Sequence, residues 1–169
     1  MNLRNMLIQE HSKVQCEKIV QWVGNDQERF DQLFTLFLQD EYRVVQRAAW
    51  PLGYAVQAHP VLIKKHFAQL ICKLRRPDQP VAVKRNTVRI LQDLDIPKKF
   101  NGEVMHLCFQ FISAPEETAA VKAFSLTILY QLSKIYPEIR RELRLVIEER
   151  WPHETASFHA RARKILQQL

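Results

Sequence analysis

The chain has 169 residues, of which 47% are hydrophobic and 25% charged, and its formal net charge is +7. It contains only three glycines, which argues against a sheet protein rich in tight turns and against a glycine-rich phosphate loop. No stretch approaches the roughly 20 apolar residues of a membrane span, and the first ten residues lack the features of a secretory signal. We therefore expect one domain with a continuous core, located in the cytoplasm.

The positive charge is unevenly distributed along the chain. Residues 1–39 hold four Lys/Arg and five Asp/Glu, a net charge of −1, whereas residues 40–169 hold 21 and 13, a net charge of +8. Residues 61–100 alone carry ten basic and three acidic side chains. A basic region of this kind favours an anionic partner, although helical proteins also carry basic faces that only contact solvent.

In chain order, the spacing of apolar residues predicts a leading helix over residues 3–23, ended by Gly24. Asn25 and Glu28 resemble a capping box at the start of the next helix. Four helix pairs follow, with first helices over 26–39, 60–76, 101–113 and 137–150, and second helices over 41–58, 80–95, 116–135 and 153–169. We expect residues 1–169 to form a single all-α domain, with repeats at about 26–58, 60–95, 97–135 and 137–169 and a linker over 96–102.

The four predicted second helices share a repeated pattern. The segments VQRAAWPLG, VKRNTVRIL, VKAFSLTIL and FHARARKIL begin at Val45, Val83, Val121 and Phe158, at spacings of 38, 38 and 37 residues. Apolar or small residues recur at offsets 0, 4, 7 and 11 within each copy, and these offsets lie on one face of a helix. Prolines recur at similar spacing where helices begin or end. The sequence therefore predicts stacked helix pairs that bury this face against their neighbours.

An acidic residue also stands five positions before the apolar residue that opens three of these helices. The residues are Asp40, Val45 and Gln46; Asp78, Val83 and Lys84; and Glu116, Val121 and Lys122. This pattern resembles the HEAT repeat over about residues 26–169. The resemblance implies a right-handed α-α superhelix in which these acids and bases form charge pairs between neighbouring repeats, a set of inter-repeat pairs made by Asp40, Asp78, Lys84, Glu116 and Lys122. The fourth copy departs from the pattern, with His153 and Phe158, so we expect a terminal cap there.

The sequence contains no motif typical of a catalytic or metal site. It has no His-Glu-x-x-His, no Cys-x-x-Cys and no Gly-x-Ser-x-Gly. The three cysteines, Cys16, Cys72 and Cys108, are far apart and each lies among apolar residues, so we expect buried, reduced thiols. We predict no metal, no cofactor and no enzymatic activity.

Five basic and aromatic residues on the second helices of repeats one and two form the candidate binding face. They are Arg47, Trp50, Tyr54, Arg85 and Arg89. The resemblance implies that second helices line the concave surface, so these side chains could form a groove suited to phosphate contact and stacking. The alternative is a solvated charged face with the aromatic rings packed between repeats.

Two functions remain open. The first is a monomeric, non-catalytic scaffold that presents this concave face to a protein or peptide partner. The second is nucleic-acid binding, since the chain more distantly resembles the HEAT-like alkylpurine DNA glycosylases, in which a concave-face aspartate flanked by tryptophans handles the damaged base. Here Trp50 is available, but the nearest aspartate, Asp93, is badly placed in the predicted register. Glycosylase activity is therefore a minor variant of the second function.

Overall fold

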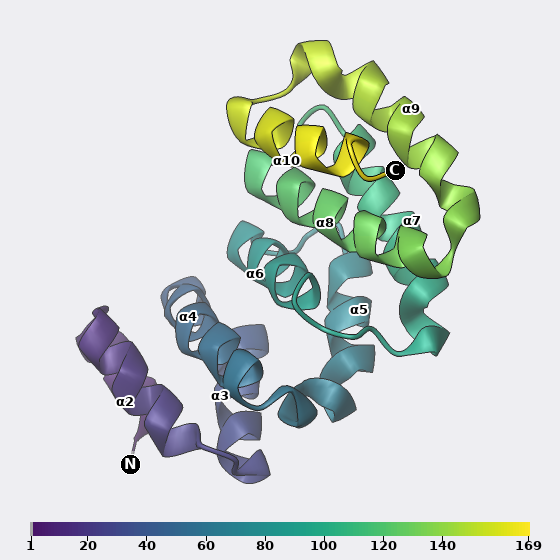
Figure 1. Cartoon of the computed structure of the whole chain (residues 1–169). Coiled ribbons are helices and arrows are strands. Elements are labelled where there is room, and N and C mark those ends of the chain that lie inside the picture. Colours follow the sequence, from purple (N-terminus) through teal and green to yellow (C-terminus); the bar gives the residue numbers. More distant parts are fainter. Residues whose placement is uncertain (1) are drawn as a thin grey trace. The chain divides into compact units, whose positions relative to one another are not determined.

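The computed structural model describes residues 2–169, and every regular element among these residues is helical (Figure 1). The chain divides into two compact units, Met1–Ile90 and Leu91–Leu169. Within each unit, helices pack against helices that are close in the chain, as expected for stacked helix pairs. None of the helices in the described range is long and apolar enough to cross a membrane.

The first unit contains five α-helices, a 3-10 helix and most of a sixth α-helix. In chain order they are α1 (Leu3–Gln9), α2 (Lys13–Val23), α3 (Gln27–Gln39), α4 (Tyr42–Ala58), the 3-10 helix Pro60–His66, α5 (Phe67–Arg75) and α6 (Val81–Leu91). The α3 and α4 helices form the main pair of this unit, and α1 and α2 pack against α4. Pro60 opens its 3-10 helix in the position expected for a first-turn proline.

The leading helix expected over residues 3–23 is two helices, α1 and α2, separated by residues 10–12. Side-chain hydrogen bonds at this break take the place of the helical backbone hydrogen bonds. Ser12 caps α2 by accepting a 3.1 Å hydrogen bond from the backbone N–H of Gln15. The amide side chain of Gln15 donates to the carbonyl of Met6 at 2.9 Å, near the end of α1. Gly24 ends α2, as predicted, at a φ of 49° that favours glycine. The next cap is Asp26 rather than Asn25, since Asp26 accepts from Arg29 N–H at 3.0 Å.

The second unit contains α7 (Lys98–Ser113), α8 (Ala119–Ile135), α9 (Arg140–Arg150) and α10 (Ala156–Leu166), with 3-10 helices at Pro137–Ile139 and Trp151–His153. The α8 helix packs on α7 and on α10, while α9 contacts α7 and α8 (Figure 1). All four α-helix starts of this unit differ from the prediction, and α9 begins three residues later than expected because Pro137–Ile139 forms a 3-10 helix. The α7 helix begins three residues earlier, directly after Pro97, whereas α8 and α10 begin three residues later because the side chains of Thr118 and Thr155 cap them.

The repeated apolar face forms the core. All residues at offsets 0, 4 and 7 of the four copies are buried: Val45, Ala49, Leu52, Val83, Thr87, Ile90, Val121, Ser125, Ile128, Phe158, Ala162 and Ile165. At offset 11, Val56 and Leu132 are buried, while Leu94 and Leu169 are half-buried. The predicted helical face is thus confirmed.

Two of the three cysteines are buried, as predicted, and the third is not. Cys16 and Cys108 are buried, and burial raises the pKa of the Cys108 thiol to about 12. Cys72 is exposed, because it lies on the outer side of the amphipathic helix α5.

Candidate functional site

A recess of about 210 Å³ lies between α4 and α6 in the first unit, next to the α1–α2 junction. We call it the α4–α6 recess. Its walls are made by seven residues: His11, Gln46, Ala49, Trp50, Arg85, Asn86 and Arg89. Two of these residues, Ala49 and Asn86, are buried.

The structure brings together three of the five residues of the predicted binding face. Trp50 of α4 faces Arg85 and Arg89, which lie one turn apart on α6. Trp50 is half-buried, with its ring 5.5 Å from the His11 ring in an edge-on arrangement and 6.4 Å from the Tyr54 ring. Tyr54 remains 45% exposed and extends this aromatic surface along α4, outside the recess.

The charge of the recess is entirely basic. Its seven lining residues include two arginines and one histidine, but no aspartate or glutamate. Arg85 is half-buried and Arg89 is exposed. Because Arg85 and Arg89 line the same recess and no carboxylate does, the recess is suited to an anionic group that accepts hydrogen bonds.

The structure places Arg47 differently from the other four residues. Its guanidinium turns toward α1 and donates to the backbone carbonyls of Leu7 at 2.9 Å and Ile8 at 2.6 Å. These carbonyls belong to the last turn of α1, where a helix lacks its own donors and where positive charge is favourable. Arg47 therefore holds the end of α1 and does not line the recess.

We expect Arg47→Ala to reduce stability without an equivalent loss of affinity for a ligand bound in the α4–α6 recess. The change removes the donors for two part-buried carbonyls, so the free energy of unfolding should fall by about 1–3 kcal/mol. Urea unfolding followed by circular dichroism measures this loss. The matched control is Arg43→Ala, which removes an exposed arginine from the first turn of α4 and should change stability by less than about 0.5 kcal/mol. Equal stabilities of the two variants would contradict the capping role.

Four residues of the recess are not among the five predicted for the binding face: His11, Gln46, Ala49 and Asn86. Gln46 occupies the position of the basic residue in the repeat pattern, and His11 lies in the α1–α2 junction. The signal for His11 is the neighbouring Ser12, a favoured capping residue that marks a helix start inside the apolar pattern of residues 3–23. No local signal indicates that this junction lies beside Trp50, because the contact joins residues 39 positions apart.

Of the residues expected to form inter-repeat charge pairs, Asp40 pairs outside the repeats. It accepts two hydrogen bonds from Arg4 of α1, at 2.8 and 3.0 Å, and Arg4 also lies 3.3 Å from Glu41. The hydrogen bond from Arg4 holds the pKa of Asp40 below its ordinary value. Asp78 is exposed and lies 3.7 Å from Arg76, Lys84 is half-buried, and Glu116 is exposed.

Lys122 makes a buried ion pair, and its partner is Glu154. The Lys122 Nζ lies 2.6 Å from Glu154 Oε1, with only 2% and 4% of the two side chains exposed. The guanidinium of Arg150 donates to the same carboxylate at 2.8 and 2.9 Å. Burial raises the pKa of Glu154, but the hydrogen bonds from Lys122 and Arg150 outweigh it, so the pKa lies below its ordinary value. The sequence signal for Glu154 is its spacing, since it follows Glu116 by 38 residues.

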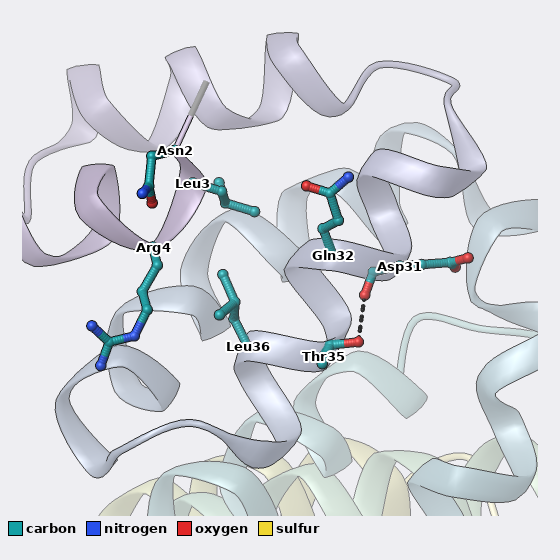
Figure 2. Close-up of a pocket in the computed structure, with 7 residues that line it drawn as sticks. All are labelled: Asn2, Leu3, Arg4, Asp31, Gln32, Thr35 and Leu36. Carbon is teal, nitrogen blue, oxygen red and sulfur yellow. Dashed lines mark hydrogen bonds between the residues drawn. The ribbon is translucent and has the colours of Figure 1, made fainter.

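A second, more open recess of about 740 Å³ lies between α1 and α3 and is lined by Asn2, Leu3, Arg4, Asp31, Gln32, Thr35 and Leu36 (Figure 2). Asp31 lies at one side of this recess, and its carboxylate points away from the other labelled side chains. The hydroxyl of Thr35 donates to the Asp31 backbone carbonyl at 2.8 Å, the bond drawn in Figure 2. The Asp31 carboxylate accepts from Gln27 at 2.9 Å, lies 2.6 Å from His66 Nε2 and pairs with Lys65. Burial raises its pKa, yet these hydrogen bonds together lower it below the ordinary value. Its oxygens are thus committed to protein donors.

Other candidate groups are dispersed. Within residues 2–169, no three His, Cys, Asp or Glu side chains gather in a way that could hold a metal ion. Asp93 lies in the second unit, in a recess of about 470 Å³ shared with Asp95, Lys134 and the exposed Ile135. Asp93 is therefore not among the residues that line the α4–α6 recess.

Comparison with known proteins identifies one family. A family model described as a HEAT repeat domain matches residues 3–169, nearly the whole chain, including α1 and α2 as well as the helix pairs. Neither the curated proteins nor the solved structures contain a significant match to the chain.

Proposed function

This chain belongs to the HEAT-repeat family, whose repeats generally serve as protein-interaction scaffolds, and we propose that it binds a protein or peptide partner through the face made by α4 and α6. The proposed role is non-catalytic. The partner would contact the α4–α6 recess and the aromatic surface of Trp50 and Tyr54 beside it.

One observation carries this proposal: two arginines and a half-buried tryptophan line one recess that contains no carboxylate. Tryptophan, tyrosine and arginine are the residue types that dominate the energetics of protein interfaces. Trp50 is also held by its contacts with His11 and Tyr54. Its side chain would therefore lose little conformational entropy when a partner binds.

The test compares charge reversal inside and outside the recess. We expect Arg85→Glu/Arg89→Glu to weaken binding of a captured partner by at least about tenfold, since each hydrogen bond to a charged group contributes roughly 1.5–3 kcal/mol. Isothermal titration with the purified partner measures the affinity, and hydrogen exchange of the complex should show protection in α4 and α6. The matched control, Arg141→Glu/Arg144→Glu, makes the same charge change at exposed positions of α9. A partner that binds both double variants equally well would contradict the proposed face.

Nucleic-acid binding is the second candidate, because arginine beside aromatic rings on which bases can stack also suits phosphates and bases. It predicts binding of labelled single- or double-stranded DNA that weakens steeply between two salt concentrations and with Arg85→Glu. Fluorescence anisotropy of DNA and RNA oligonucleotides at both salt concentrations distinguishes it from the scaffold. A glycosylase-like activity would further need a carboxylate beside Trp50, and the recess lining has none.

A further inference from the structure

We propose that the α4–α6 recess binds a phosphate monoester, carried on a phosphorylated serine, threonine or tyrosine of the partner. This inference rests on the proposed scaffold function and names the chemistry that its recess recognises. The group would lie between Arg85 and Arg89, with His11 and Gln46 as additional donors at the rim.

The recess differs from the surroundings of four other arginines of the first unit, which already have acceptors. Arg4 pairs with Asp40, Arg29 with Asp26 and the Trp22 carbonyl, Arg47 with two carbonyls, and Arg76 with Asp78. Arg85 and Arg89 instead share a recess whose lining offers no carboxylate. An anion bound in this recess would be stabilised by both positive charges.

A phosphate monoester fits this arrangement better than a carboxylate. It carries a charge near −2 at neutral pH and three acceptor oxygens, enough for both guanidinium groups and a further donor. A carboxylate carries a single charge and would leave one arginine without a full partner. The volume of about 210 Å³ is also below the roughly 300–1,000 Å³ of pockets that enclose a whole small-molecule ligand, so the recess suits one group of a larger partner.

A phosphorylated peptide also fits better than a nucleic-acid strand. Nucleic-acid affinity comes from several phosphate contacts along a backbone. The nearest further cation on α4, Arg47, is turned away to the carbonyls of α1, and Lys13 on α2 lies 3.8 Å from Glu17. The recess therefore offers one strong anion position, and Trp50 and Tyr54 beside it offer an apolar surface for a neighbouring side chain of a peptide.

The experiment uses the full chain and oriented peptide libraries with a central phosphoserine, phosphothreonine or phosphotyrosine, each matched with unphosphorylated and glutamate-substituted versions. We expect at least about tenfold tighter binding of a phosphorylated set by fluorescence anisotropy, reflecting the added charge-assisted hydrogen bonds. Arg85→Gln/Arg89→Gln should abolish the preference, whereas Arg141→Gln/Arg144→Gln should retain it. Circular dichroism confirms that each variant is folded.

Three outcomes would overturn the inference: equal binding of phosphorylated and glutamate peptides, an unchanged preference in Arg85→Gln/Arg89→Gln, or tighter binding of a single-stranded oligonucleotide at the same salt concentration. Phosphatase treatment of a captured partner separates this failure from that of the scaffold proposal. If the dephosphorylated partner still binds and still depends on Arg85 and Arg89, the phosphate inference fails and the scaffold remains. If binding depends on neither arginine, both proposals fail.

Discussion

Glu154→Gln should lower the free energy of unfolding by about 3–5 kcal/mol, the cost of removing one partner from a buried ion pair. The change leaves the ammonium of Lys122, only 2% exposed, without its carboxylate. Arg150 loses the same acceptor, but it lies nearer the surface and can reach solvent. Chemical denaturation measures the loss, and hydrogen exchange should show it in α8, α9 and α10.

The control for this change is Glu148→Gln, which neutralises an exposed glutamate of α9 and should alter stability by less than about 0.5 kcal/mol. Lys122→Met/Glu154→Met should recover much of the loss, because replacing both members of a buried pair by apolar side chains avoids the uncompensated charge. A loss below about 1 kcal/mol in Glu154→Gln would contradict the buried-pair account.

The same carboxylate makes stability depend on pH in a defined direction. The pKa of Glu154 is lower in the folded chain than in the unfolded chain, because the hydrogen bonds from Lys122 and Arg150 outweigh burial. Its contribution is therefore fully present above the unfolded pKa and is lost as the pH falls through the folded pKa. We expect the difference in stability between the wild type and Glu154→Gln to shrink below about pH 5. A difference that grows on acidification would have the wrong sign.

Phe34→Ala should lower the free energy of unfolding by about 3–5 kcal/mol, as expected for a large cavity in a packed core. Phe34 is 2% exposed on α3, stacks on His66 at 4.1 Å between ring centroids and lies 6.3 Å from the Phe30 ring. Its removal also withdraws the surface that orients His66 toward Asp31, whose carboxylate lies 2.6 Å from the imidazole. Denaturant unfolding measures the loss, and hydrogen exchange should locate it in α3, α4 and α5.

Tyr42→Ala serves as the comparison for Phe34→Ala. It removes an aromatic ring that is 58% exposed at the first position of α4 and should change stability by less than about 1 kcal/mol. Similar losses of unfolding free energy in the two variants would show that packing around Phe34 contributes little to the stability of the first unit.

The helix pairs and the buried face were predictable because their signals are local. Apolar residues at offsets 0, 4 and 7 lie on one side of any helix, whatever the rest of the fold. The positions that open each copy, Val45, Val83, Val121 and Phe158, are accordingly buried. Prolines and capping residues likewise act within a few positions. The apolar pattern continues across Ser12, so periodicity predicts one helix over residues 3–23, whereas the Ser12 cap starts a new helix there.

Charge pairing was less predictable, because the partners of long charged side chains are set by tertiary packing. Lys122 pairs with Glu154, 32 residues away, and Asp40 pairs with Arg4, 36 residues away. Repeat spacing predicts a charge pair for Lys122. In the fourth copy, however, Glu154 stands four positions before Phe158 and not five, so the pattern does not identify Glu154 as the partner.

The all-helical repeat, its buried face and the basic character of the second helices follow from the sequence alone, since helix periodicity and composition are properties of short segments. Which of these cations line a recess depends on tertiary packing. Arg47 and Arg85 occupy the same position in successive copies, yet Arg47 holds the carbonyls of α1 while Arg85 lines the α4–α6 recess with Arg89. The physical reason is that a guanidinium turns to the best acceptor within its reach, and the acceptors for Arg47 come from a helix about 40 residues earlier in the chain.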